Sequence, residues 1–414
     1  MFKSFHKLLE STFWNNFIHL SLNQGTNVLV ALIVTPYLFQ TLGEVEFGLV
    51  NLALTTIMLL SILVNYGFHL NGPRRLALLR ADKFGTQVLI NEILQTRILL
   101  SFTAALLLLI VVKLGNYFPG HQDLLIYSSI LLLNEAIFPF LILQGFDRIS
   151  WVSIANPISK GLYLLAVVWL IKEPSDAFLV NFLLGLTALT VNTGLLIFIF
   201  RAEGFLFVWT PIGRIFTQLK GNFQFFLSTI AGHISIHGGL IILSNFVSEF
   251  EIGQYSLSQR IAFLLRLIPT FIIQSILQKA AKLHGKDVRL FDKYLSVAYR
   301  GGLLATFMLG FIVLFTSKYI ILLLSGEYIA YSTQILQVLA FIPFCSALNV
   351  SNMVRILVKE QKKVLALSTW ITTVFMIISA VIGSMIYGGI GLAIALLFTE
   401  FVSFLVHFYF LRTK

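Results

Sequence analysis

The sequence contains little charge and only one cysteine. Charged residues make up 11% of its 414 residues, against about 25% in soluble domains, while 57% are hydrophobic and the mean hydropathy is +0.89. Such a composition cannot cover an aqueous surface, so we expect the lipid bilayer to be its solvent. The single Cys345 excludes an intrachain disulfide and a cysteine metal cluster, and we expect a buried, space-filling thiol.

The sequence also lacks the common motifs of enzymes. It has no G-x-x-x-x-G-K-[ST] loop, no H-E-x-x-H and no Asp-x-Asp pair. The loops predicted to lie outside are short, whereas a membrane polymerase or ligase of surface glycans would more naturally carry a sizeable outer loop with its catalytic groups. The sequence therefore predicts a transporter that is not an enzyme and needs no cofactor or metal.

The apolar residues fall into segments long enough to cross a bilayer, for which about 20 residues are needed. They predict an all-α polytopic membrane protein of about 12 transmembrane helices, behind a basic, amphipathic opening segment. The predicted spans are 17–41, 47–70, 98–115, 123–145, 156–172, 177–201, 222–247, 251–278, 297–324, 329–357, 364–387 and 389–411. An even number of spans places both termini on the same side.

The Lys and Arg residues predict which side that is, because positively charged loops stay in the cytoplasm. Under this topology 24 of the 29 lie in inner loops or termini, three lie outside (Lys113, Lys172 and Lys318) and two lie within a span (Arg260 and Arg266). We therefore predict a multi-pass protein of the bacterial inner membrane with cytoplasmic N- and C-termini. The same asymmetry explains the net charge of +11, so no nucleic-acid partner is needed.

An internal repeat divides the chain near its middle. Residues 127–140 align with 331–344, Arg97 with Arg300, and the Glu46-Phe-Gly48 segment with Glu251-Ile-Gly253, at separations of 203 to 205 residues. These matches predict two pseudo-symmetric six-helix lobes of the same orientation around a central cavity. The expected domains are an N-lobe at 1–201, a cytoplasmic linker at 202–221 and a C-lobe at 222–414.

Polar side chains inside the spans are costly and usually face the bundle interior or a water-filled route. In the first span Asn23 and Asn27 share a helical face, with Gln24 beside them, and in the seventh span His233 and His237 do the same. Asn65 extends a shorter stripe in the second span. We interpret these residues as substrate-binding side chains of the cavity; the alternative is interhelical hydrogen bonding without transport.

Three ionisable residues carry the sharper hypotheses. Arg266 lies roughly 20 Å along the eighth span, at 1.5 Å per residue, so its guanidinium needs an anion or water. Arg260 lies six residues before it, about 120° away in helical angle. The alternative for Arg266 is an intramembrane ion pair with Glu135 or Glu400. Glu135 lies deep in the fourth span and is a candidate ion-coupling site, with structural pairing as the equal alternative.

Several short motifs carry a resemblance to a known family. They are Pro36 to Gly43 followed by Glu46 to Gly48, Asn65 to Phe68 ahead of the basic Arg74 to Arg80 segment, and Leu324 to Tyr328 with Ser332 after it. In these the chain resembles Wzx-type polysaccharide flippases, which move O-antigen or capsule repeat units. That family belongs to the multidrug, oligosaccharidyl-lipid and polysaccharide exporter superfamily.

The resemblance implies a two-lobe transporter with spans one, two, seven and eight around its cavity. It further implies that undecaprenyl-diphosphate-linked oligosaccharides move from the cytoplasmic to the periplasmic leaflet by alternating access, without ATP and with a coupled ion. The expected partners are this lipid-linked substrate, the bilayer and other glycan-assembly membrane proteins. Two alternatives stay open: a cation-coupled multidrug exporter and a membrane glycan polymerase or ligase.

Overall fold

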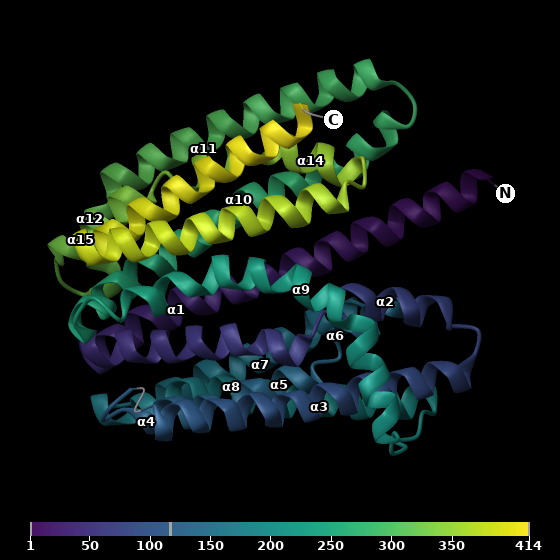
Figure 1. Ribbon diagram of the computed structural model, residues 1–414, viewed down its shortest axis with the longest axis horizontal. Coiled ribbons are helices and arrows are strands. Elements are labelled where there is room, and N and C mark those ends of the chain that lie inside the picture. Colours follow the sequence, from purple (N-terminus) through teal and green to yellow (C-terminus); the bar gives the residue numbers. More distant parts are fainter. Residues whose placement is uncertain (1, 116–117, 413–414) are drawn as a thin grey trace. The chain divides into compact units, whose positions relative to one another are not determined.

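The computed structural model describes residues 2–115 and 118–412, with side chains described from Gly25 onward except Gln278. These residues form fifteen α-helices and one short 3₁₀ helix, with no strand among them (Figure 1). The helices are α1 (Phe2–Asn65), α2 (Phe68–Leu78), α3 (Lys83–Leu114), α4 (Gln122–Ser128), α5 (Ile130–Ile137), α6 (Phe140–Gly145), α7 (Ser150–Leu170), η1 (Pro174–Asp176), α8 (Ala177–Glu203), α9 (Ile212–Leu243), α10 (Glu249–His284), α11 (Val288–Ser325), α12 (Ala330–Leu339), α13 (Ile342–Leu348), α14 (Val350–Val358) and α15 (Lys362–Arg412).

Ten of the described segments are long and apolar enough to cross a membrane. Two of them, Gly25–Leu78 and Lys362–Arg412, measure 54 and 51 residues, about twice what one crossing needs. Each is interrupted at a glycine with positive φ, Gly43 at 79° and Gly388 at 57°. Residues with a Cβ rarely adopt this backbone conformation. Each of these segments therefore makes two passes, and the described residues contain the twelve that the sequence predicts.

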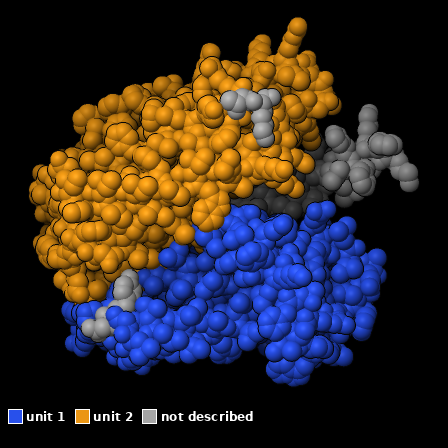
Figure 2. All heavy atoms as spheres, in the orientation of Figure 1, with its two compact units in different colours: residues 1–42, 56–230 blue, residues 43–55, 231–414 orange. Residues whose placement is uncertain are grey.

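The helices gather into two compact units, coloured separately in Figure 2. Unit 1 holds Met1–Leu42 and Thr56–Ile230, and unit 2 holds Gly43–Thr55 and Ala231–Lys414. In unit 1 a buried apolar cluster joins α2, α3 and α6, while α8 packs against α5 and α7. In unit 2 a second apolar cluster joins α10, α11, α13 and α14. The predicted lobe boundaries stay a prediction.

The fourth and tenth predicted spans are broken helices. The fourth consists of α4, α5 and α6, and the tenth of α12, α13 and α14. Pro139 and Pro343 match in the internal repeat: Pro139 is the N-cap of α6, and Pro343 lies in the first turn of α13. Proline removes a backbone donor and disfavours the helical conformation of the residue before it, and Phe138 has a ψ of 113°. The repeat found in the sequence thus marks two equivalent helix breaks.

Another pair of repeat-related residues meets inside unit 2. Gly48 packs against the backbone of Gly253. These two glycines end the repeat-related segments Glu46-Phe-Gly48 and Glu251-Ile-Gly253. A Cβ on Gly253 would lie 2.6 Å from the carbonyl carbon of Glu44, closer than real Cβ atoms approach a neighbour. Small residues allow such close backbone contact between membrane helices. Glycine at 253 therefore permits the packing of residues 43–55 on α10.

The segment between α8 and α9 is extended and bound to α3 along its length. Three amide side chains on one face of α3, spaced four residues apart, bond to the backbone of alternate residues of the segment. The bonds join Gln87 to Leu206, Asn91 to Leu206 and Val208, and Gln95 to Val208 and Thr210, at 2.7 to 3.3 Å. Four helical residues rise about 6 Å and two extended residues about 6.6 Å, so the two spacings match.

Within the predicted linker of 202–221, the irregular part is limited to residues 204–211. Helix α8 runs to Glu203, Gly204 closes it in the left-handed conformation, and α9 begins at Ile212. The start of α9 is also tied to unit 1, because Glu92 on α3 binds both Arg214 and Gln218, at 3.0 and 2.5 Å. The segment and the first turns of α9 therefore belong structurally to unit 1.

Candidate functional site

Arg266 forms an ion pair with Glu400 inside unit 2. Helix α10 carries the arginine and α15 the carboxylate, and Nη2 of Arg266 contacts Oε1 of Glu400. The side chains are 32% and 11% exposed, respectively. A carboxylate that is this well buried needs a compensating charge, which the guanidinium supplies. Of the two partners considered for Arg266, the structure shows Glu400, while Glu135 has other contacts.

A small cavity lies beside this ion pair. It measures about 20 Å³, is walled mainly by apolar side chains, and has Gln259 and Arg266 as polar members of its lining. One water needs about 10–15 Å³, so the cavity has room for a water but not for a diphosphate. Arg266 could therefore meet an anionic ligand only through its exposed side, with the donors that Glu400 does not use.

The two histidines of α9 lie as the sequence predicts, on one face. The ring centroids of His233 and His237 are 6.0 Å apart, and both side chains are half-buried. Ser235 bonds to Thr373 of α15 at 2.7 Å, which fixes the neighbouring face of α9 against its own unit. Arg260 on α10 is also half-buried in unit 2. Unit 2 thus contains all four predicted residues of the C-lobe.

The predicted asparagines of unit 1 are engaged with other helices. Asn27 accepts a hydrogen bond from Asn156 of α7 at 3.2 Å, and Asn65 donates one to Glu135 of α5 at 2.9 Å. Both therefore make the interhelical bonds that were the alternative to substrate binding. The side chains of Asn23 and Gln24, which were also predicted to bind substrate, lie outside the described residues.

Glu135 belongs to a charged cluster that the sequence analysis missed. Nη2 of Arg97 lies 3.5 Å from Oε1 of Glu135, and the arginine is 2% exposed while the glutamate is 27% exposed. Arg97 was counted with the inner loops, but it lies within helix α3, which begins fourteen residues earlier at Lys83. The structural pairing considered for Glu135 is thus present, and its partner is Arg97.

Arg97 also satisfies the backbone at the break in the fourth span. Its guanidinium donates to the carbonyl oxygens of Glu135 and of Phe138, the latter at 3.2 Å. Those carbonyls lack ordinary helical partners because α5 ends at Ile137. In unit 2 the repeat-related positions are an exposed Arg300 and the apolar Leu339, so the charged cluster is not repeated there. Of the two helix breaks described here, the one in the fourth span therefore combines a buried arginine with a partly exposed carboxylate.

Comparison with known families shows which family the chain belongs to. The family described as "Polysaccharide biosynthesis protein" matches residues 13–277, well over half of the chain. The chain belongs to the polysaccharide biosynthesis protein family. Two curated relatives of this family member carry the name "Putative O-antigen transporter". The one from Shigella dysenteriae is 24% identical over 93% of this chain and 96% of its own length; the one from Escherichia coli K12 is 24% identical over 63% of each.

Solved structures agree on the fold of this family member. The lipid II flippase MurJ, in an inward closed conformation, aligns with a TM-score of 0.75 at 16% identity over 95% of this chain and 87% of its own. An inward-facing MATE-family multidrug resistance transporter aligns with a TM-score of 0.72 at 14% identity over 96% and 97%. Both similarities concern the fold, and they confirm the all-helical transporter fold that the sequence predicts.

Sequence reasoning thus named both members of the Arg266–Glu400 pair, as an alternative, but only Glu135 of the Arg97–Glu135 pair. It did not choose between Glu135 and Glu400 as the partner of Arg266, and it placed Arg97 in a loop. The amide ladder of Gln87, Asn91 and Gln95 was also missed. Its four-residue spacing is visible in the sequence, yet these residues precede the predicted start of the third span at 98.

Proposed function

We propose that the chain is a flippase for undecaprenyl-diphosphate-linked oligosaccharide repeat units. It moves them from the cytoplasmic to the periplasmic leaflet of the bacterial inner membrane by alternating access of a central cavity between two lobes. The observation that carries this proposal is the Shigella relative named for O-antigen transport, which matches 93% of the chain. The fold shared with a lipid II flippase supports the same class of substrate.

In this proposal the predicted polar residues divide the recognition of the substrate. Arg266 and Arg260 bind the diphosphate through charge-assisted hydrogen bonds, which guanidinium groups make in pairs. The hydroxyl groups of the sugars bind to the amide and imidazole side chains of Asn23, Gln24, Asn27, Asn65, His233 and His237. The 32% exposure of Arg266 supports its role, because donors remain beyond those that Glu400 occupies.

Glu135 is the proposed ion-coupling residue. It lies beside a helix break and keeps 27% exposure, and discontinuous helices in transporters commonly hold coupling ions. Glu135→Gln should make transport in vesicles independent of an imposed proton or sodium gradient, while Glu135→Asp should keep that dependence. An unchanged gradient dependence in Glu135→Gln would assign Glu135 to structure only.

The orientation rests on the distribution of Lys and Arg, and both termini are proposed to be cytoplasmic. Reporter proteins fused after Lys83, Lys220 and Lys363 should all report a cytoplasmic location. A periplasmic signal at any of these three positions would overturn the twelve-span topology.

The exposure of the histidines to the route can be tested by thiol labelling. Cysteines placed at His233 and His237 in a Cys345→Ala background should react with a membrane-impermeant thiol reagent from at least one side. A control cysteine at Met376, which is fully buried, should stay unreactive. If the cysteines at 233 and 237 are as inert as the control, the histidines only pack α9 within its unit.

The substrate class is tested by analysing lipid-linked sugars in a strain without the gene. Loss of a flippase should cause undecaprenyl-diphosphate-linked repeat units to accumulate and surface glycan to disappear. Loss of a polymerase would instead leave single repeat units at the surface. A strain with normal lipid-linked sugars but greater sensitivity to organic cations would identify a multidrug exporter.

A further inference from the structure

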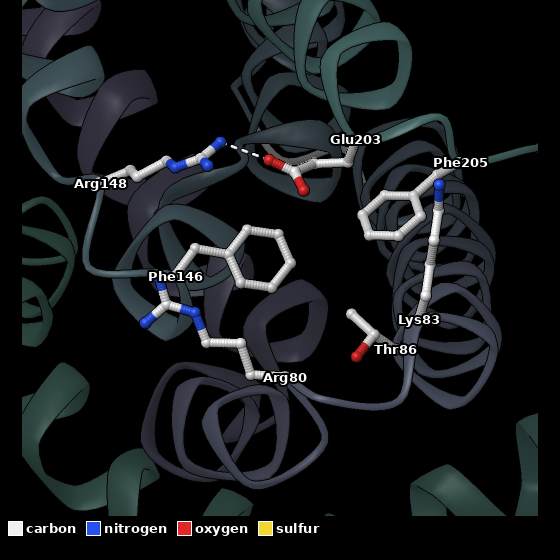
Figure 3. A pocket seen from close by; sticks show the side chains of 7 residues that line it. All are labelled: Arg80, Lys83, Thr86, Phe146, Arg148, Glu203 and Phe205. Atoms are coloured by element: carbon white, nitrogen blue, oxygen red, sulfur yellow. Dashed lines mark hydrogen bonds and ion pairs between the residues drawn. The ribbon is translucent and has the colours of Figure 1, made fainter.

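A basic pocket lies at the end of unit 1 where α2 joins α3 and α6 joins α7. It encloses about 220 Å³ and is lined by Arg80, Lys83, Thr86, Phe146, Arg148, Glu203 and Phe205. Figure 3 shows the Phe146 ring between Arg80 and the Arg148–Glu203 pair, with Lys83 on the opposite side beside Phe205. One water needs only about 10–15 Å³, so the pocket has room for a much larger polar group.

The charge of this lining favours an anion. Three cationic side chains share the pocket with one carboxylate, Glu203, which is paired with Arg148. Arg80 pairs at 3.3 Å with Asp147, but both side chains are more than half exposed, and such pairs contribute little. Each arginine keeps most of its five N–H donors for another acceptor. An excess of positive charge therefore remains inside the pocket.

Lys83 is the cation of the pocket without an acceptor. Among the described residues, none forms an ion pair or hydrogen bond with its ammonium group. The ammonium lies over Gly204, where a Cβ would come within 3.0 Å of it. Because Gly204 has no side chain, the three donors of Lys83 stay open to a ligand.

An apolar groove adjoins the basic pocket, and Phe205 belongs to the lining of both. The groove measures about 250 Å³ and is walled by α3, α8 and the extended segment, through residues such as Ile98, Leu196 and Phe207. Phe207, which belongs to this lining, is 52% exposed. A cationic pocket next to an apolar groove matches an amphiphile with a negative head and an apolar tail.

We propose that an anionic phospholipid binds here, with its phosphate between Lys83 and Arg80 and one acyl chain in the groove past Phe205. Two features exclude a zwitterionic headgroup as the preferred ligand. The excess of positive charge would repel a choline cation, and the carboxylate that could bind one, Glu203, is already paired with Arg148. Basic pockets between membrane helices commonly bind anionic headgroups for the same electrostatic reason.

The test is native mass spectrometry of the purified full-length protein in detergent. Phosphatidylglycerol and phosphatidylcholine with identical acyl chains are titrated separately, and the affinity of the first retained lipid is compared. Phosphatidylglycerol should bind more tightly to the wild type. In R80Q/K83Q its affinity should fall about 25-fold, at roughly fivefold for each removed charge, and the preference over phosphatidylcholine should disappear.

Two further variants keep this test decisive. K286Q/R289Q removes one lysine and one arginine from exposed positions outside the pocket and should bind like the wild type. K83Q alone breaks no contact of the described residues and should lose about fivefold. Equal binding of the two lipids by the wild type, or wild-type affinity in R80Q/K83Q, would overturn the proposal.

A final arm separates a lipid from a soluble phosphate. Glycerol 3-phosphate carries the same phosphate without acyl chains, so it should not compete with phosphatidylglycerol at equal concentration. If it displaces the lipid equally well, the pocket binds a soluble phosphate and the lipid assignment is wrong. None of these outcomes depends on which molecule the protein transports.

Discussion

Arg266 of α10 and Glu400 of α15 form an ion pair that connects two helices of unit 2. Such a pair has a structural consequence whether or not the arginine binds substrate. Removing one member leaves the other as an uncompensated charge, which costs about 3–5 kcal/mol when fully buried and less here, because Arg266 is 32% exposed. Structure and substrate binding must therefore be tested separately.

Neutral substitutions separate the two roles of Arg266. Arg266→Gln and Glu400→Gln should each lower membrane abundance, and the double variant should restore it, because no charge is left unpaired. Surface glycan should stay absent in the double variant if Arg266 binds the diphosphate. The measurements are quantitative immunoblotting and surface glycan analysis, and full export by the double variant would assign Arg266 to structure alone.

Arg97 should be among the most sensitive positions of unit 1. Arg97→Met removes the partner of Glu135 and leaves two backbone carbonyls at the helix break without donors. We expect a loss of about 3–5 kcal/mol, seen as a large drop in the thermal unfolding temperature in detergent. The repeat-related Arg300→Met, at an exposed position, should change little. Equal effects of the two substitutions would contradict the assigned role of Arg97.

The amide ladder predicts that the extended segment is held on α3. The triple variant Q87L/N91L/Q95L removes five hydrogen bonds to the segment, each contributing about 0.5–1.5 kcal/mol. Chymotrypsin should then cleave faster within 205–211, which contains Phe207 and Trp209. The matched control is T187V/T190V/T193V on α8, whose hydroxyl groups bond only within their own helix. No difference between the two variants would show that other contacts hold the segment.

Two glycine-to-alanine substitutions should change stability in opposite directions. Gly161→Ala adds a methyl group where no atom lies within 4 Å and should stabilise α7 by up to about 1 kcal/mol. Gly253→Ala places its methyl against the carbonyl group of Glu44 and should destabilise the packing of residues 43–55 on α10. Thermal unfolding of both purified variants measures the sign. A stabilised Gly253→Ala protein would show that this close contact is not required.

Much of the fold could be predicted because the bilayer imposes strong local rules. The lengths of the apolar segments give the number of spans, and the glycines at 43 and 388 lie between predicted spans, where a reversal needs positive φ. The repeat of residues 127–140 and 331–344 marked the two broken helices through a shared proline. The breaks themselves were not predicted, because hydropathy does not report a short irregular stretch within an apolar span.

The pairing of charges was harder to predict than their positions. Arg266 was recognised from its depth, but selecting Glu400 as its partner requires knowing how α15 packs against α10, which one sequence does not reveal. Arg97 was missed because hydropathy placed the start of its span at 98, while helix α3 begins at Lys83. Polar residues just outside a predicted span should therefore also be considered as part of a longer helix.

The central claim, movement of a lipid-linked oligosaccharide between leaflets, is tested most directly in reconstituted vesicles. Purified protein is incorporated into liposomes that contain an undecaprenyl-diphosphate-linked oligosaccharide, and a membrane-impermeant reagent that modifies the sugar is added outside. We predict that modification proceeds beyond the outer-leaflet pool to include the inner one, and that the Arg266→Gln/Glu400→Gln protein stops at the outer pool as empty liposomes do. Modification that stops at the outer pool with the wild-type protein under every imposed ion gradient would contradict the account.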